Sequence, residues 1–426
     1  MRILYVSPDL GVPVLGRKGA SVHVRGLVDA LTRAGHRVVL AAPLLNKSPW
    51  EEPAALAGQV LHLPLSAEAT EVVLAVKAFE ETVGAESSIP GELRRILYDQ
   101  QSAVALKRRF EHHPPDFIYE RASLYATAGV KVAAELGVPL LLELNAPLAE
   151  EQATYRATGL GDLAARVERW ALNRADAVLA VSAPLREYAT SLGVDPACAH
   201  VVPNGVDPTE FQPGPPDRSV RARWDLGDGP VLGYVGGLRP WHGVGALPGL
   251  LKRLVGRFDG LRLVIAGDGP LRPELERAIT SAGLARAAVF TGSIPHEQVP
   301  ALIRTFDLAL APYDRFERPF YFSPLKLFEY MACGIPVVAA DLGQIAEIID
   351  GDSGRVYPAG DLAGLTAACE ELLGDPVLRR RQGEAAADKV HSRHTWAHNA
   401  ARVTDLARSL LEPPPGADER QVPSSG

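Results

Sequence analysis

The stretch Ser323-Pro324-Leu325-Lys326-Leu327-Phe328-Glu329-Tyr330-Met331-Ala332-Cys333-Gly334 leads into Ile335-Pro336-Val337-Val338-Ala339-Ala340, and the rest of the chain is organised around it. Ser323 is a good N-cap, and Pro324 suits the first helical position, where its missing N–H costs nothing. Gly334 suits the C′ position, and the apolar residues that follow predict a short buried strand. The sequence therefore predicts a helix docked on a sheet, with its N-terminus free to face a ligand.

Two charged residues of this helix allow two interpretations. Lys326 lies in the first turn, where the helix dipole disfavours a cation unless an anion is near. Glu329 lies three residues on, at the edge of the apolar face, where a carboxylate can accept hydrogen bonds from sugar hydroxyls. The alternative is an ordinary i,i+3 salt bridge between the two side chains. Helix physics alone leaves both interpretations open.

Length and composition indicate an ordinary globular protein of two domains. The chain has 426 residues, more than a single hydrophobic core usually supports, so two domains are expected. Hydrophobic residues make up 47% and charged residues 22%, as in ordinary globular proteins. Its net charge of −7 argues against a general nucleic-acid binder. The cysteines, Cys198, Cys333 and Cys369, are far apart and are expected to be reduced thiols rather than disulfides or a zinc site.

The two ends of the chain suggest a location and a tail. Arg2–Val6 reads directly as a strand, so we expect no signal peptide, and no apolar run approaches a membrane span. We therefore expect a cytoplasmic protein whose membrane contact is at most peripheral, at the inner membrane face. A helix from about Gly91 to Phe110 carries five Arg and Lys residues, which indicate either a solvated face or a membrane patch. Residues 412–426 read as a disordered tail.

Strands and helices alternate through both halves, which predicts an α/β fold with two Rossmann-like doubly wound domains facing across a cleft. A single helix is expected over Glu151 to Asn173. The predicted domains are 1–208, 209–392, a terminal helix 393–411 that returns to the first domain, and the tail. The boundary rests on the turn and Pro-rich linker around residues 204–216. No G-x-G-x-x-G spacing follows the first strand, so a dinucleotide site is not expected.

In the first half, polar residues follow two predicted strands. Glu120 and Arg121 end one strand, and Glu143 and Asn145 end another. Ligands of α/β sheets bind at the carboxyl ends of parallel strands, so these four residues are site candidates. The alternative is that they only cap strand ends and form salt bridges between loops.

In the second half, a glycine turn follows a predicted strand. Gly236 and Gly237 let backbone N–H groups approach a ligand, and Arg239 and His242 add charge beside them. With Lys326 and its helix N-terminus, these groups suit a diphosphate that is bound and then stabilised as a leaving group. Alternatively, Arg239 is a surface residue and Trp241 belongs to the core.

Sequence motifs for metal binding or for a catalytic nucleophile are weak in this chain. Asp350-Gly351-Asp352 is a DxD sequence in an apparent tight turn and is interpreted as turn chemistry rather than a metal motif. Metal ligands are therefore not expected. Nucleophile patterns such as G-x-S-x-G are not evident.

The ordered motifs resemble glycosyltransferase family 4, retaining nucleotide-sugar transferases with the GT-B fold, over about residues 1–411. The motifs that carry the resemblance are Gly19-Ala20-Ser21, Gly35-His36-Arg37-Val38, Ala175-Asp176-Ala177-Val178 with Val181-Ser182, Val202-Pro203-Asn204-Gly205-Val206-Asp207, Tyr234-Val235-Gly236, Gly267-Asp268-Gly269-Pro270, Thr291-Gly292-Ser293-Ile294-Pro295 and residues 326–338. Each motif is weak alone, but their order is specific.

The resemblance implies roles for individual residues. The second half is expected to bind the donor, with Glu329 on its ribose and the backbone of Ser293 and Ile294 reading its base. The other residues implied on the donor side are Gly19, Gly236, Gly237, His242, Gly243, Leu325 and Leu327. The acceptor side is expected to hold Ser21, Glu120, Arg121, Glu143 and Asn145.

The sequence also departs from the family. The family pairs two glutamates eight residues apart, and the position eight before Glu329 is Tyr321. The family's Gly-Arg turn with a following Lys-Gly reads here as Gly236-Gly237 and His242-Gly243. Arg239 and Lys326 are the candidates to supply the displaced charge and are the expected catalytic residues.

The resulting hypothesis is a metal-independent retaining transfer of a hexose from a UDP- or GDP-linked donor to an acceptor hydroxyl. The donor is a substrate, and no cofactor is expected. The acceptor is expected to be a sugar, a lipid-linked sugar or a small molecule. A sugar-nucleotide epimerase of the same fold and a non-catalytic nucleotide-sugar-binding protein are the alternatives.

Overall fold

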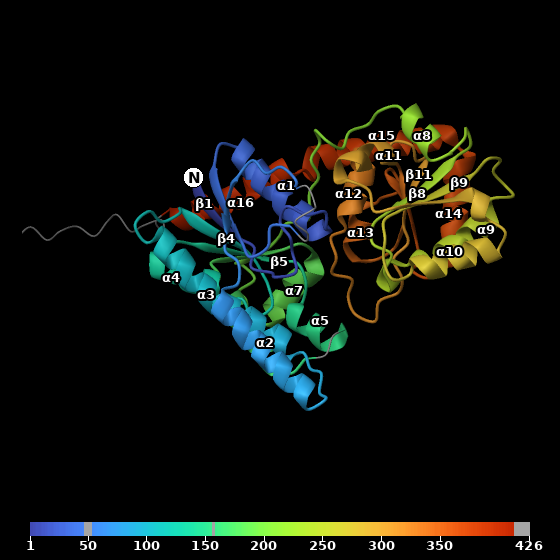
Figure 1. Ribbon diagram of the computed structural model, residues 1–426. Helices are drawn as coiled ribbons and strands as arrows, with labels where there is room; N and C mark the ends of the chain where they lie inside the picture. Colours follow the sequence, from blue (N-terminus) through green and yellow to red (C-terminus); the bar gives the residue numbers. More distant parts are fainter. Residues whose placement is uncertain (47–52, 156–157, 413–426) are drawn as a thin grey trace, which may run out of the picture. The chain divides into compact units, whose positions relative to one another are not determined.

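The computed structural model describes residues 1–46, 53–155 and 158–412 and divides the chain into two compact units (Figure 1). Unit 1 comprises Met1–Ala180, Leu185–Val202 and the chain from Asn399 onward. Unit 2 comprises Val181–Pro184 and Pro203–His398. The change of unit at Pro203 precedes the linker on which the boundary at 208 was based. The tail predicted for 412–426 lies outside the described residues from position 413 on.

Unit 1 is built on a parallel sheet of seven strands in the order β3-β2-β1-β4-β5-β6-β7. The central strands are almost continuously apolar because helices cover both faces of a parallel sheet. The strands are β1 Arg2–Val6, β2 Arg37–Ala42, β3 Gln59–His62, β4 Phe117–Arg121, β5 Leu140–Leu144, β6 Ala177–Ala180 and β7 Ala199–Val201.

The helices of unit 1 include a pair in the stretch where the sequence predicted one. The single helix expected over residues 151–173 was wrong, because α5 ends at Tyr155 and Gly161 starts a new helix. The helices are α1 Gly19–Arg33, α2 Ala67–Thr82, α3 Ile89–Phe110, α4 Ala128–Leu136, α5 Leu148–Tyr155 and α6 Gly161–Leu172. Two further helices, α7 Ala183–Ser191 and α16 Trp396–Leu411, have residues in both units.

Unit 2 is built on a second parallel sheet, with the strand order β10-β9-β8-β11-β12-β13. One apolar core fills the unit, and Leu327, Phe328 and Met331 of the opening stretch are fully buried in it. The strands are β8 Val231–Val235, β9 Arg262–Ala266, β10 Ala288–Gly292, β11 Leu308–Ala311, β12 Val337–Ala340 and β13 Gly354–Tyr357.

The helices of unit 2 include one that the sequence pattern did not reveal. Residues 376–393 are mostly polar, so helix α15 shows little apolar periodicity. The helices are α8 Arg218–Arg223, α9 Leu247–Leu254, α10 Arg272–Ser281, α11 Val299–Ile303, α12 Leu325–Ala332, α13 Gly343–Ile348, α14 Leu362–Gly374 and α15 Pro376–Arg393.

The opening stretch forms α12 and β12, with a different N-terminus from the one predicted. Pro324 is the N-cap residue, and no side chain caps the helix. Ser323 instead uses its hydroxyl to accept a hydrogen bond from the Asn204 backbone at 2.9 Å. Gly334 takes a left-handed φ of 75° after the helix, as predicted for a C′ glycine. The first N–H groups of α12 are thus not covered by a side-chain cap.

Each sheet has a point where its strand order reverses, between β1 and β4 in unit 1 and between β8 and β11 in unit 2. Ligands of open α/β sheets bind beyond the carboxyl ends of the strands at this switch point. A ligand is therefore expected at each of these two sheet edges.

No helix within residues 1–46, 53–155 and 158–412 is both long and apolar enough to cross a membrane. On α3, the basic residues Lys107 to Arg109 are exposed, and Lys107 pairs with Glu135 at 2.9 Å. These contacts fit a solvated face, one of the two interpretations of the basic helix.

Candidate functional site

The glycine turn after β8 allows backbone and side chain to meet closely. Gly236 has a φ of 140°, and a Cβ at this position would lie 2.6 Å from the Lys326 ammonium nitrogen. Gly243 has a φ of 66°, and its Cβ would collide with the carbonyl oxygen of Pro312. Glycine is therefore required at both positions, and the turn brings Lys326 against the backbone at the switch point of unit 2.

Lys326 is held by aromatic side chains rather than by a carboxylate. Its Nζ donates to the Tyr234 hydroxyl at 2.9 Å and lies 4.1 Å from the centroid of that ring and 5.5 Å from the Tyr313 ring. Burial lowers the pKa of Lys326 to about 7, although the charge of Glu329 opposes this. In the described part of the chain no ion pair joins Lys326 to Glu329, so the simple salt-bridge interpretation is wrong.

Glu329 is nearly buried and has unused hydrogen-bonding capacity. Its residue is 9% exposed, and its carboxylate accepts no hydrogen bond from the described residues. Burial raises the pKa of Glu329 to about 7, opposed by Lys326 and assisted by Glu210. A carboxylate in this position is available to hydroxyl donors of a ligand.

His242 is not the cationic group that the sequence suggested. Its Nδ1 lies 2.6 Å from the carbonyl oxygen of Gly237, which also accepts from the Tyr234 hydroxyl at 2.9 Å. Burial, together with the charges of Lys326 and Arg239, lowers the pKa of His242 to about 4. The ring is therefore neutral at pH 7, and donation from Nδ1 leaves Nε2 as an acceptor.

Arg239 supplies a second cation at this edge. It is exposed and lies 5.6 Å from the Trp241 ring centroid, and Trp241 is itself 40% exposed. The interpretation of Trp241 as a core residue was wrong, whereas Arg239 does lie on the surface. Arg239 and the protonated form of Lys326 give this edge positive charge from two separate elements.

The other predicted donor-side residues differ in exposure. Ser293 is exposed and Ile294 half-buried after β10, and Leu325 is half-buried at the start of α12. Leu327 is fully buried, so only its backbone can contact a ligand. Gly19 is exposed at the first position of α1 in unit 1.

At the switch point of unit 1, one carboxylate collects four hydrogen bonds. Glu143, at the end of β5, accepts from Arg121 at 2.7 Å and from His23 at 2.7 Å. Tyr119 and Asn145 also donate to it. Burial alone would raise the pKa of Glu143, but these neighbours more than offset it and hold the pKa below its usual range. Three of the four predicted strand-end residues thus form one cluster.

Glu120 points to the opposite face of the sheet. Its strand neighbour Arg121 joins the Glu143 cluster, and successive side chains alternate between faces. Oε2 of Glu120 is buried without a hydrogen-bond partner among the described residues, and it lies where a Cβ on Gly129 would be. Burial, assisted by the charge of Asp99, raises the pKa of Glu120 to about 8.

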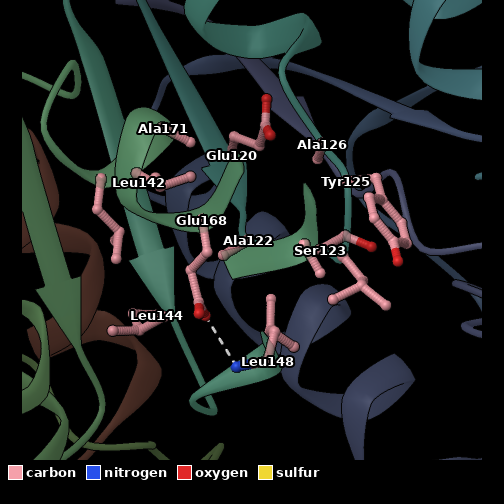
Figure 2. Close-up of a pocket in the computed structure, with 13 residues that line it drawn as sticks. Glu120, Ala122, Ser123, Tyr125, Ala126, Leu142, Leu144, Leu148, Glu168 and Ala171 are labelled. Atoms are coloured by element: carbon pink, nitrogen blue, oxygen red, sulfur yellow. Dashed lines mark hydrogen bonds between the residues drawn. The ribbon is translucent and has the colours of Figure 1, made fainter. Parts of the chain in front are cut away.

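Glu120 also contributes to the wall of a small pocket, shown in Figure 2. The cavity volume is about 20 Å³, about the space that one water molecule needs. Glu168 borders it and accepts from the Leu148 backbone at 2.8 Å, and the Glu120 carboxylate points away from Glu168. This pocket is too small for a sugar.

Buried hydroxyl groups without partners lie on the elements that meet at this switch point. Ser7 follows β1, Ser21 lies in the first turn of α1, and Tyr5 stacks on Tyr119 with ring centroids 4.9 Å apart. Each of the three hydroxyl oxygens is buried without a hydrogen-bond partner among the described residues. Ser21 was a predicted acceptor-side residue, whereas the other two were not.

Comparisons with known proteins match both halves of the chain. Residues 17–210 match the model described as Glycosyltransferase Family 4, and residues 229–375 match Glycosyl transferases group 1. Glycogen synthase of Mycobacterium tuberculosis is 29% identical over 408 residues, covering 93% of this chain and 92% of that protein. Alpha-maltose-1-phosphate synthase of Mycolicibacterium smegmatis is 31% identical over 302 residues, covering 66% of this chain and 76% of that protein.

The chain belongs to glycosyltransferase family 4. Its architecture agrees with this, since it resembles the Anabaena protein HepE, solved in complex with UDP, with a TM-score of 0.71. That match has 19% identity and covers 96% of this chain and all of the other. The fold is GT-B, with two Rossmann-like units, as the sequence predicted.

In this family 4 glycosyltransferase, several residues around the candidate sites were missed by sequence reasoning. They are the residues that hold the charged groups: Tyr234 and Tyr313 around Lys326, and His23 and Tyr119 around Glu143. The two strand tyrosines and Tyr313 read as core residues, and nothing in their local pattern signals a polar partner. His23 faces inward on α1, and a histidine within a buried helix face was the available signal.

The DxD sequence of this family 4 chain is engaged in local contacts. Asp350 accepts hydrogen bonds from the backbone of Ser353 at 3.0 Å and from its hydroxyl at 2.7 Å. Asp350 also pairs with Lys389 at 2.8 Å. Its carboxylate closes the turn before β13, which confirms the interpretation as turn chemistry.

Proposed function

We propose that the chain is a retaining glycosyltransferase that transfers a hexose from a UDP- or GDP-linked donor to an acceptor hydroxyl without a metal ion. The observation that carries the proposal is Lys326, a lysine at the switch point of unit 2 that bonds to Tyr234 and to no carboxylate within the described residues. A cation placed in this way favours binding of an anion such as a diphosphate.

The names of similar proteins support a nucleotide-sugar donor. HepE was solved in complex with UDP, and the relatives named above are synthases of a glycan and of a sugar phosphate. The donor is a substrate in this proposal, and no cofactor takes part.

The proposed chemistry assigns the leaving diphosphate to unit 2. Lys326, Arg239 and the uncapped N-terminus of α12 would stabilise the negative charge that develops as the bond to the sugar breaks. The departing phosphate oxygen would take the proton of the acceptor hydroxyl, so the step needs no protein base. Two side-chain cations then supply positive charge that a metal ion would otherwise provide.

The donor's neutral groups have their own candidate partners. Glu329 would accept the ribose hydroxyls, since its carboxylate is nearly buried and has no hydrogen-bond donor among the described residues. Nε2 of His242 would accept one hydroxyl hydrogen bond, and the backbone of Ser293 and Ile294 would contact the base.

Unit 1 would bind the acceptor. Arg121, Glu143 and Asn145 form one cluster at its switch point, with the Ser21 hydroxyl on α1. Glu120 takes no part in this proposal, because it faces the opposite side of the sheet.

The first test is donor binding followed by turnover. UDP-, GDP-, ADP- and dTDP-sugars are compared by thermal shift, since a ligand that binds only the folded state raises the unfolding midpoint. The nucleotide sugar that raises it then serves as donor, and product is analysed for transfer and for retention at the anomeric carbon. An epimerase would form product without any acceptor.

Lys326→Ala and Arg239→Ala are each expected to lower turnover about a hundred- to a thousandfold, because each removes charge stabilisation of the leaving group. Lys252→Ala and Arg253→Ala are matched controls, since both side chains are exposed on α9. Near-normal turnover of both site variants would rule out the assignment of the leaving group to this edge.

A further inference from the structure

In the cluster around Glu143, the carboxylate of Glu143 itself is fully hydrogen-bonded, whereas Arg121 can still contact a ligand. The Glu143 side chain is 3% exposed, and its two oxygens accept four hydrogen bonds, two on each oxygen. Four is the number of lone-pair positions on a carboxylate, so Glu143 has no capacity left for substrate. Its contribution must act through the groups that it holds.

Arg121 is the cation in this cluster that has unused donors. A guanidinium has five N–H donors, and Arg121 uses one hydrogen bond among the described residues, the bond to Glu143. Its side chain is 15% exposed, and none of its nitrogens is sealed from solvent without a partner. Unbonded donors of a mostly buried cation are unfavourable unless a ligand or water accepts from them.

The strand register places Arg121 where an α/β sheet binds its ligand. Val6 of β1 lies beside Glu120, and Arg121 lies beside Glu143 of β5. Ser7 follows Val6 directly, so it lies one residue beyond the last pair of β1 with β4, at the switch point of unit 1. Ser7 has a buried hydroxyl without a partner in the described chain, an observation independent of the Arg121 contacts.

The charge of the exposed group indicates the class of ligand. Planar guanidinium forks match carboxylate and phosphate groups better than they match isolated hydroxyls. Glu143 accepts one hydrogen bond from Nη1 of Arg121, and Asn145 adds an amide that is half-buried at the same edge. The arrangement presents a fixed cation with polar neighbours rather than an apolar surface.

We propose that Arg121 binds an anionic group, a phosphate or carboxylate, on the acceptor, and that Glu143 is the positioning residue that orients Arg121. The statement that the anion belongs to the acceptor rests on the proposed function. The anion site itself is inferred from the residues of unit 1 alone. It narrows the acceptor from any hydroxyl compound to one that carries a negative charge near the reacting hydroxyl.

The test measures binding directly, so it does not depend on turnover. α-D-Glucose 1-phosphate is the anionic probe and glucose the neutral one, with affinities for the full-length protein measured by calorimetry. The phosphate is expected to bind at least about tenfold more tightly than glucose. Arg121→Gln is expected to remove about ten- to a hundredfold of that affinity, the range for a charge-assisted hydrogen bond, and Arg121→Lys to restore part of it.

Three variants locate the anion and check the fold. Arg108→Gln, an exposed arginine on α3, is the matched control and is expected to bind like the wild type. Lys326→Gln tests the other unit. If Lys326→Gln loses probe binding and Arg121→Gln retains it, the anion binds in unit 2 and the inference is overturned. Weaker nucleotide binding by Arg121→Gln would assign Arg121 to the donor and also overturn it.

The positioning role has a separate readout. Glu143→Gln is expected to weaken probe binding, and the double variant Arg121→Gln/Glu143→Gln is expected to bind no more weakly than Arg121→Gln alone. Additive losses would show that Glu143 does not act through Arg121. If Glu143→Gln does not fold, the Arg121 series still decides the anion site.

The outcome separates this inference from the proposed function. Arg121-dependent binding of the probe without any glycosyl transfer supports the anion site and overturns the proposed function. Transfer to neutral acceptors with equal affinity for glucose and glucose 1-phosphate supports the proposed function and overturns the anion site.

Discussion

Glu120 is a buried carboxyl group whose charge has little compensation. Its residue is 2% exposed, Oε2 has no partner among the described residues, and Asp99 adds a like charge nearby. Burial raises its pKa to about 8, whereas the unfolded chain titrates near the ordinary value of 4.5. The folded state therefore holds this proton more tightly than the unfolded state does.

This difference predicts how stability changes with pH. Between pH 4.5 and about pH 8 the folded chain binds more protons at Glu120, so its stability is fully present below pH 4.5 and falls as pH rises through 8. The loss is at most about 5 kcal/mol. Glu120→Gln removes the titration, so relative to the wild type it should gain unfolding free energy from pH 5 to about pH 8 and level off by pH 9.

Denaturant unfolding of both proteins at several pH values measures the change. Any fixed effect of the amide shifts the two curves by a constant, and only the slope of their difference reports the titration. A difference that stays constant from pH 5 to pH 9 would contradict the raised pKa of Glu120.

At the residue scale, the sequence could identify charged groups but not their partners. Lys326 and Glu329 were found from their positions on a short helix, because position relative to the helix N-terminus is local information. Tyr234, which accepts a hydrogen bond from Lys326, is 92 residues away in sequence. The side of the sheet on which its ring lies is set by the pairing of the strands. The neutral state of His242 likewise depends on burial that no local pattern shows.

At the scale of elements, α4 approaches β4 closely at Gly129, where the missing side chain leaves room for the Glu120 carboxyl group. A Cβ there would overlap Oε2 of Glu120 and lie 2.7 Å from its carboxyl carbon. The helix position itself allows alanine, so the constraint comes from the neighbouring strand rather than from the backbone angles.

Gly129→Ala is therefore expected to destabilise the protein by about 1 to 3 kcal/mol through overpacking. Glu120→Ala/Gly129→Ala should be more stable than the sum of the two single changes predicts, since removal of the carboxyl makes room for the methyl group. Thermal and denaturant midpoints of the three variants give the coupling.

Gly91→Ala is the matched control on a neighbouring helix. A Cβ at Gly91 of α3 would have the Arg95 guanidinium as its nearest neighbour, at 3.7 Å, so alanine fits there and its helix propensity favours the change. Equal destabilisation at both glycines would contradict the steric explanation for Gly129.

The elements that the sequence predicted best are those with strong patterns. Strand β1 has the predicted bounds, and helix α16 ends at the predicted residue 411 but starts at Trp396 rather than at 393. Both were found because apolar runs and helical periodicity are local. The long polar helix α15 was missed, and α5 and α6 were merged into one, because polarity and spacing alone did not mark these ends. The register that sets Arg121 beside Glu143 could not be predicted, since it depends on pairing between distant strands.

At the scale of the whole molecule, α16 is one of two helices with residues in both units. It starts at Trp396 in unit 2, and its residues from Asn399 onward belong to unit 1. Val403 lies in the unit 1 part of α16 and is fully buried. The apolar core of unit 2 is formed by residues between 206 and 390 and does not include Val403. Two separate cores make two unfolding transitions the expectation, rather than one.

Val403→Asp tests this independence. A carboxylate in an apolar position should cost about 3 kcal/mol or more and should lower the transition of unit 1. If a nucleotide binds unit 2 as proposed, it should still raise the other transition in scanning calorimetry, because the residues around Lys326 are in the second core. Arg402→Asp, on the exposed side of α16, is the control and should leave both transitions near their wild-type values. If Val403→Asp abolishes the effect of the nucleotide, the two cores unfold as one cooperative unit, and the sharing of α16 is the structural reason.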